Sequence, residues 1–223
     1  MSFTIPSSEL AQLGIPVVTI EREDQYVCSV NTDNYMGGIQ ATSLLAKLGC
    51  DILLHINTPT APEIPAYGRI RGFLDICAER QLNHRIIYRS LGSTYEQMQK
   101  NLDAIIDELE AEYPTQKKGI FISSDTHANI LLNLLIRRYS TLPDDYLIVG
   151  FDDSPIAREA VIPISTVGQQ IDKLAYEAVS LLVDLMNERK KRRPVPLEEP
   201  IHKIIPPILQ RRATTEKDFH ISL

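Results

Sequence analysis

The chain has 223 residues, of which 43% are hydrophobic, and a formal net charge of -6. This length and apolar content are enough to bury a core, which excludes an intrinsically disordered chain, and the acidic balance disfavours direct binding of nucleic acid. Three cysteines without metal or disulfide spacing exclude a zinc finger and a disulfide scaffold. We therefore expect a soluble cytoplasmic protein with no membrane span, no metal and no cofactor.

The first half of the chain alternates helix and strand signals. Apolar spacing and capping residues predict a helix at 8–13, strands at 15–20 and 27–30, a helix at 34–49, a strand at 52–56, a helix at 67–80, a strand at 85–88 and a helix at 94–112. Asp33 or Asn34 is the expected cap of the second helix, and Gly49 ends it.

The same alternation continues in the second half. The pattern predicts a strand at 119–123, a helix at 127–139, a strand that ends in Gly150, a strand at 165–167, a helix from 171 to about 188 and a strand at 203–209. Pro206 and Pro207 confine the last strand to a sheet edge or a bulge. From residue 214 we expect a tail.

Strands that alternate with helices predict parallel sheets, which bind ligands at the carboxyl ends of their strands. Polar side chains follow several of the expected strands, and they are Asp33, Tyr67, Arg69, Ser93, Ser124, Asp125, Asp152 and Asp153. Carboxylates beside an arginine suit a ligand with several hydroxyl groups. Arg71 lies about 200° from Arg69 on a helix, so at most one of the two faces the ligand.

Each carboxylate also has a structural interpretation. For Asp33, a role as a helix cap explains the residue as well as ligand contact does. Asp125 could likewise cap the helix that follows it. Because successive residues at the end of a strand diverge, one of Asp152 and Asp153 is expected to face the ligand. The other would cap the turn at 154–156.

Seven segments, in order along the chain, resemble the effector-binding region of the LacI/GalR family of bacterial transcriptional regulators. They are GIPVVTIER at 14–22, VNTDNYMGGIQATSLLAKLG at 30–49, GRIRGF at 68–73, FISSD at 121–125, IVGFDDSPIA at 148–157, ISTVGQQIDKLAYEAVSLL at 164–182 and LQRRAT at 209–214.

The resemblance implies an α/β fold of the type I periplasmic-binding-protein kind, with two Rossmann-like lobes and parallel sheets. The expected division gives a partial amino-terminal lobe at 1–49 and 170–200, a carboxyl-terminal lobe at 50–169 and 201–214, and a tail at 215–223. Family members begin with a helix-turn-helix, a hinge helix and the first strands of the amino-terminal lobe. This sequence enters at the GIPVV strand, so we expect a truncated lobe and no operator binding by the chain itself.

The resemblance also assigns effector-binding residues. Arg69 matches the arginine of the family and Asp152 matches its acid, while Ser124 stands where many members have asparagine, next to Asp125. Gln169 lies at the expected crossing between lobes, and Asp33 and Tyr67 complete the expected site. Since the chain has no tryptophan, stacking on a sugar must fall to an aromatic residue near the site: Tyr35, Tyr67 or Phe151.

The expected function is that of a sensor rather than an enzyme. A sugar or sugar-like effector would bind between the lobes of a homodimer and change DNA binding by the intact protein. One alternative is an exported sugar-binding protein that feeds a transporter. Another is a Mg²⁺-dependent enzyme acting on sugar phosphates through Asp125, Asp152 and Asp153.

Overall fold

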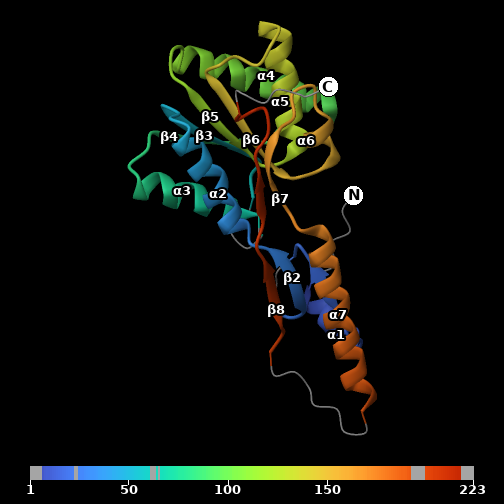
Figure 1. Ribbon diagram of the computed structural model, residues 1–223. Helices are drawn as coiled ribbons and strands as arrows, with labels where there is room; N and C mark the ends of the chain where they lie inside the picture. Colours follow the sequence, from blue (N-terminus) through green and yellow to red (C-terminus); the bar gives the residue numbers. More distant parts are fainter. Residues whose placement is uncertain (1–6, 23–24, 61–63, 65, 192–198, 217–223) are drawn as a thin grey trace, which may run out of the picture.

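The computed structural model describes residues 7–22, 25–60, 64, 66–191 and 199–216, and its strands form two separate sheets (Figure 1). The elements in chain order are α1 (Ser7–Gln12), β1 (Val18–Ile20), β2 (Cys28–Thr32), α2 (Asn34–Lys47), β3 (Ile52–Asn57), α3 (Tyr67–Glu79), β4 (His84–Tyr88), α4 (Tyr95–Glu112), β5 (Lys118–Ile122), α5 (Asp125–Tyr139), β6 (Tyr146–Asp152), α6 (Pro155–Glu159), β7 (Ser165–Gly168), α7 (Ile171–Lys190), β8 (His202–Ile205) and β9 (Ile208–Gln210). The predicted alternation of strands and helices is confirmed.

The larger sheet has the strand order β4-β3-β5-β6-β7-β9, and every pairing in it is parallel except that of β9 with β7. Helices α2 and α3 cover one face, and α4, α5 and α6 cover the other (Figure 1). A parallel sheet that is covered on both faces needs strands that are apolar throughout, and β6 is buried from Tyr146 to Phe151.

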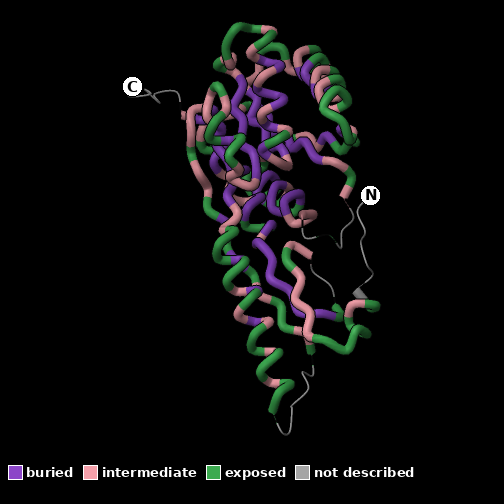
Figure 2. Tube along the Cα trace, turned by 90° about the vertical axis from the view of Figure 1, so that its right-hand side faces the viewer, coloured by how far each residue is buried: buried purple, intermediate pink, exposed green. Residues whose placement is uncertain are grey.

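Alternate residues along a strand pack into two different hydrophobic cores, one on each face of the sheet. Ile148 packs with residues of α4 and α5, whereas its neighbours Val149 and Leu147 pack with residues of α2 and α3. Most of the buried chain lies in this larger lobe (Figure 2). The carboxyl ends of its strands are therefore held by two packed layers.

The smaller sheet consists of β1, β2 and β8, all parallel, with α7 packed against it (Figure 1). Its core is small: Val30 of β2 and Ile205 of β8 meet Leu174 and Leu181 of α7. Within the described residues, no helix combines the length and the apolar content that a bilayer-spanning segment requires.

The packing differs from the expected lobe boundaries at two places. Helix α2 packs against α3 and the larger sheet, not with the smaller lobe, because Ala41, Leu44 and Leu45 point into the core beneath α3. The strand predicted at 203–209 is divided, since β8 pairs with β2 and β9 pairs with β7. Pro206 and Pro207 lie between them, where the chain passes from one sheet to the other and no ladder donor is needed.

The end of the chain is also more ordered than expected. Thr214 is 1% exposed, and its Oγ1 donates to the carbonyl of Ile148 at 2.7 Å and accepts from the amide of Ser165 at 2.9 Å. Thr215 Oγ1 lies 2.6 Å from Ser165 Oγ. Residues 214–216 are thus part of the larger lobe, whereas residues 217–223 of the expected tail lie outside the described residues.

Candidate functional site

Arg69 lies at the carboxyl edge of the larger sheet, in the first turn of α3, and is only 9% exposed. Its Nε donates to Asn34 Oδ1 at 2.7 Å, and its Nη1 donates to the carbonyl of Ser123 at 2.6 Å. The guanidinium carbon lies 3.5 Å from the centre of the Phe151 ring, a stacking contact that orients the planar group. Three different elements therefore fix one arginine.

Burial lowers the pKa of Arg69 to about 10, and the carboxylate of Asp152 is the strongest group acting in the opposite direction, followed by Glu21 and Asp125. The arginine stays protonated at neutral pH because this pKa is still well above 7. The site thus contains a buried cation with acidic groups around it.

Asp152 ends β6 and has a positive φ of 114°, a conformation that costs energy for a residue with a side chain. Burial raises the pKa of its carboxyl group to about 6, an effect that Arg69 opposes and that Asp125 and Glu21 reinforce. Among the ion pairs of the described residues, none joins Arg69 directly to Asp152. The two charged groups therefore affect each other's pKa without forming an ion pair, and both keep hydrogen-bonding positions for a ligand.

A raised pKa of Asp152 makes the stability of the fold depend on pH. The folded protein holds this proton more tightly than the unfolded chain, so stability falls as pH rises from about 4 to about 6 and is level above that. We expect Asp152→Asn to remove this loss, which amounts to at most about 3 kcal/mol. Urea unfolding at pH 4 and pH 7.5 measures the effect; an equal pH dependence in both proteins contradicts it.

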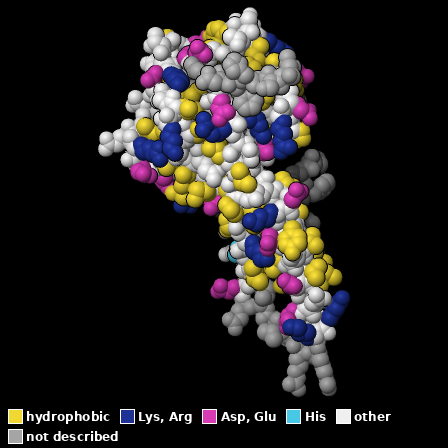
Figure 3. Space-filling model, in the orientation of Figure 1, with side chains coloured by type: hydrophobic (Ala, Val, Ile, Leu, Met, Phe, Trp, Pro, Cys, Tyr) yellow, Lys and Arg dark blue, Asp and Glu magenta, His cyan; other side chains and the backbone are white. Residues whose placement is uncertain are grey.

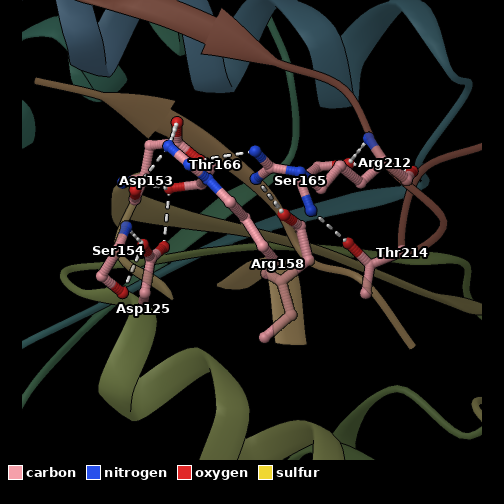
Figure 4. Close-up of polar contacts among 9 residues, drawn as sticks. Asp125, Asp153, Ser154, Arg158, Ser165, Thr166, Arg212 and Thr214 are labelled. Carbon is pink, nitrogen blue, oxygen red and sulfur yellow. Dashed lines mark hydrogen bonds and ion pairs between the residues drawn. The ribbon is translucent and has the colours of Figure 1, made fainter. Parts of the chain in front are cut away.

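Asp125 was expected to contact the ligand or to cap its own helix, and the structure gives it neither role. The residue is fully buried, its Oδ1 accepts from Thr166 Oγ1 at 2.6 Å, and its Oδ2 accepts from the amide and hydroxyl of Ser154 at 2.8 and 3.1 Å (Figure 4). Ser124 is the cap instead, because its Oγ accepts from the amide of His127, and α5 begins at Asp125 rather than at 127. Asp125 therefore holds β7 and the turn after β6 in place.

Asp153 does not cap the following turn, because its carboxylate is paired with two arginines. Its Oδ2 pairs with Arg158 Nη2 at 2.7 Å, and its Oδ1 pairs with Arg212 Nη2 at 2.5 Å (Figure 4). Although burial acts against it, the hydrogen bonds from these two arginines lower the pKa of Asp153. The two ion pairs hold Asp153, whose φ is 54°, and with it the strained end of β6.

Of the remaining predicted site residues, Asp33 and Gln169 lie where the two sheets are connected. Asp33 caps α2, and its Oδ1 accepts from the amide of Met36 at 2.8 Å. Tyr67 begins α3, two residues and so about 200° around the helix from Arg69, and is half-buried. Gln169 lies between β7 and α7, at one of the points where the chain crosses between the sheets.

Sequence reasoning missed Glu21 and the role of Asn34. Glu21 follows β1, its Oε1 accepts from the amide of Thr32 at 2.5 Å, and it acts on the pKa values of both Arg69 and Asp152. It brings a carboxylate from the smaller sheet to the site, and its position directly after a strand was the available signal. Asn34 was considered only as a cap, whereas its side chain is 3% exposed and accepts from Arg69.

A pocket of about 200 Å³ lies elsewhere, at the start of β6, where Tyr146, Leu147, Ile162 and Thr214 contribute to its wall. Since β6 ends at Asp152, this pocket is at the opposite end of the strand from the polar cluster. The chemistry of the buried arginine and its acids, rather than the presence of this hollow, identifies the candidate site.

Comparison with known proteins gives a consistent picture of the fold. Residues 42–207 match the family model described as a periplasmic binding protein-like domain. Among solved structures, the chain is similar to a periplasmic binding protein/LacI transcriptional regulator from Alkaliphilus metalliredigens complexed with D-xylulofuranose. The two are 26% identical with a TM-score of 0.75, over 94% of this chain and 74% of that one.

Two characterised relatives are both ribose operon repressors. The one from Halalkalibacterium halodurans is 30% identical over 83% of this chain, and the one from Bacillus subtilis is 25% identical over 94% of it. The chain spans 54% and 60% of the lengths of these two relatives.

Proposed function

The chain belongs to the periplasmic-binding-protein-like domain family, and from this premise we propose that it is the effector-binding part of a LacI-type transcriptional regulator. Its effector is a small sugar, and a pentose in furanose form is the first candidate. The relatives support this choice, because two are ribose operon repressors and one structural neighbour is a complex with D-xylulofuranose.

The observation that carries the proposal is the buried Arg69 on the ring of Phe151, with Asp152 close by and no direct ion pair between the two charges. A guanidinium donates in a fixed direction and a carboxylate accepts from vicinal hydroxyls, so together they suit a polyhydroxylated ring. The sugar would then lie against the partly exposed Asp152, with Gln169, Tyr67, Asp33 and Ser124 as further contacts.

Binding would be coupled to the relative orientation of the two sheets. The chain passes between them at 32–34, 168–171 and 205–208, and Glu21 comes from the smaller sheet whereas Arg69 and Asp152 come from the larger lobe. A ligand that contacts both sides favours the orientation in which both sets of contacts form. In the intact protein, as a homodimer in the cytoplasm, this shift would change how DNA-binding segments sit on an operator.

The two alternatives receive less support. The relatives are repressors, which favours a regulator over an exported transport protein. The Mg²⁺ enzyme would use Asp125, Asp152 and Asp153 as ligands, but Asp125 already accepts three hydrogen bonds and Asp153 is paired with two arginines. We therefore propose binding without catalysis.

Calorimetric titration with D-ribose and D-xylulose tests the proposal, with sucrose and cellobiose as larger comparison sugars. We expect saturable binding of a pentose at a 1:1 ratio, and a loss of about tenfold or more in affinity in Asp152→Ala because a hydrogen bond to a charged group is removed. If no sugar of the panel binds, or if a pentose binds equally well to Asp152→Ala, the proposal is wrong.

A further inference from the structure

Arg212 links its own segment of the chain to the end of β6 and to the start of β7. Its Nη2 donates to Asp153 Oδ1 at 2.5 Å (Figure 4), its Nη1 donates to the carbonyl of Ile164 at 3.0 Å, and its amide donates to Ser165 Oγ at 2.7 Å. Lys and Arg side chains are scattered over the face of the molecule seen in Figure 3, so an exposed arginine needs no special explanation. The side chain of Arg212 is only 15% exposed, and it is held at both ends.

The segment that Arg212 contacts has an unfavourable backbone conformation. Asp152 and Asp153 have φ values of 114° and 54°, so two successive residues with side chains lie in the region that favours glycine. A Cβ on Gly168 of β7 would lie 2.9 Å from the Cβ of Asp153, which shows how closely the next strand approaches this segment. Such a conformation persists only where surrounding contacts hold it. Without them, φ would return to negative values and the Asp152 side chain would change direction.

Side chains from several elements hold this segment. The backbone amides of residues 153 and 154 donate to side chains of β7 and α5, at 3.4 and 2.8 Å, and the carboxylate of Asp153 is paired with Arg158 and Arg212. The two ion pairs are unequal, because the side chain of Arg158 is 61% exposed. An exposed pair contributes little, whereas loss of one partner from a shielded pair leaves the other charge without compensation. Arg212 is therefore the stronger of the two charged contacts of Asp153.

The conformation of this segment matters for binding because it sets the direction of the Asp152 side chain. We propose that Arg212 is a positioning residue for effector binding: through Asp153 it holds the backbone at 152–153 so that the Asp152 carboxylate stays beside Arg69. Arg212 acts without contacting the effector, since its guanidinium is engaged by Asp153 and by a backbone carbonyl. The consequence for sugar binding rests on the proposed function, whereas the effect on the position of Asp152 does not.

The position of the Asp152 carboxyl group can be followed without any sugar, from its pKa in a carbon NMR titration. Burial raises this pKa to about 6; Asp125 and Glu21 act in the same direction, and Arg69 acts against it. If Arg212→Met releases the segment, the carboxyl group leaves its buried position and its pKa should fall to about 5 or below. Loss of the Arg212 charge alone would raise the pKa, so a fall reports a change in the position of the carboxyl group.

Arg211→Met is the matched control. It makes the same change one residue earlier in the chain, on a side chain that is 51% exposed and paired with Glu216. It should leave the pKa of Asp152 at about 6 and the affinity for sugar within about twofold. Arg212→Lys keeps the charge but cannot donate in a fork to both acceptors, and it should cause a smaller fall of the same pKa. Thermal melting verifies folding, and Arg212→Lys carries the test if Arg212→Met does not fold.

Calorimetric titration with D-ribose and D-xylulose in a double-mutant cycle tests the consequence for binding. Arg212→Met should weaken binding of a pentose about tenfold in the otherwise unchanged protein, but should cause no further loss in the Asp152→Ala background, since its effect passes through Asp152. Equal losses in both backgrounds would show that Arg212 supports the lobe in general, which contradicts the proposal.

The titration without sugar decides the proposal independently of the effector. A pKa of Asp152 that stays at about 6 in both Arg212 variants overturns it, whether or not a sugar binds. If no sugar binds to the unchanged protein, the proposed effector is wrong, and a fall of the Asp152 pKa in Arg212→Met but not in Arg211→Met still supports the positioning role.

Discussion

Arg69→Met is expected to reduce affinity for a pentose effector by about a hundredfold or more, the largest effect on binding of any single change in the site. A hydrogen bond from a charged donor contributes about 1.5–3 kcal/mol, and a hundredfold loss corresponds to about 2.7 kcal/mol. Methionine fills the space beside Phe151 but cannot donate to a sugar, to Asn34 or to the carbonyl of Ser123. Calorimetric titration with D-ribose and D-xylulose gives the ratio of affinities.

Arg71→Met is the matched control for this change. Arg71 is two residues along the same helix, is exposed, and has its guanidinium carbon 5.7 Å from the centre of the Tyr35 ring, away from Asp152. The affinity of Arg71→Met should stay within about twofold of the unchanged protein, since a change in an exposed side chain away from the site is worth about 0.5 kcal/mol or less. Equal losses in the two variants would mean that general positive charge, rather than the buried guanidinium, supports binding.

Gly72→Ala is expected to have the largest effect on stability, lowering the free energy of unfolding by about 2–3 kcal/mol. A Cβ at position 72 would lie 2.2 Å from the carbonyl oxygen of Tyr35 and 2.9 Å from the amide nitrogen of Ile39. Both atoms belong to the backbone of α2, so α2 and α3 would have to separate. The better helix propensity of alanine, worth up to about 1 kcal/mol, does not offset this overpacking.

Thermal unfolding measures the change as a fall in Tm of about 5–10 °C for a chain of this length. Glu79→Ala, an exposed change near the end of α3, is the control and should shift Tm by no more than about 2 °C. Because α2 and α3 are so close that a Cβ at Gly38 would lie 2.3 Å from the carbonyl oxygen of Arg69, separation of the helices should also move Arg69 and weaken effector binding. A Gly72→Ala protein as stable as Glu79→Ala would show that the contact between α2 and α3 can relax freely.

Local residue pattern was sufficient for the elements and for part of the site. Apolar runs such as Leu147 to Val149 and the helical spacing in 95–112 predicted the alternation because burial of a parallel sheet requires them. The position of Arg69 and Asp152 at strand and helix ends also followed, since the carboxyl ends of parallel strands meet at one edge. The assignment of these two residues to effector binding came from the family resemblance and stays a prediction.

Residue pattern did not show which carboxylates were available to a ligand. Asp125, Asp152 and Asp153 are equivalent in the sequence, each placed after a buried strand. Asp125 is occupied by donors from Thr166 and Ser154, and Asp153 by Arg158 and Arg212. All of these partners except Arg158 are distant in the chain from the acid that they contact, so only the tertiary structure separates Asp152 from the other two.

By itself, the sequence determined an α/β chain of parallel strands, with an acidic and basic cluster at the strand ends, because periodicity and capping are local properties. The tertiary structure decided that α2 packs on the larger sheet, that Pro206 and Pro207 divide the last strand between two sheets, and that Thr214 is buried. Each of these outcomes depends on contacts between segments far apart in the chain. Their energies come from long-range packing and hydrogen bonds, which cannot be read from the spacing of residues along the chain.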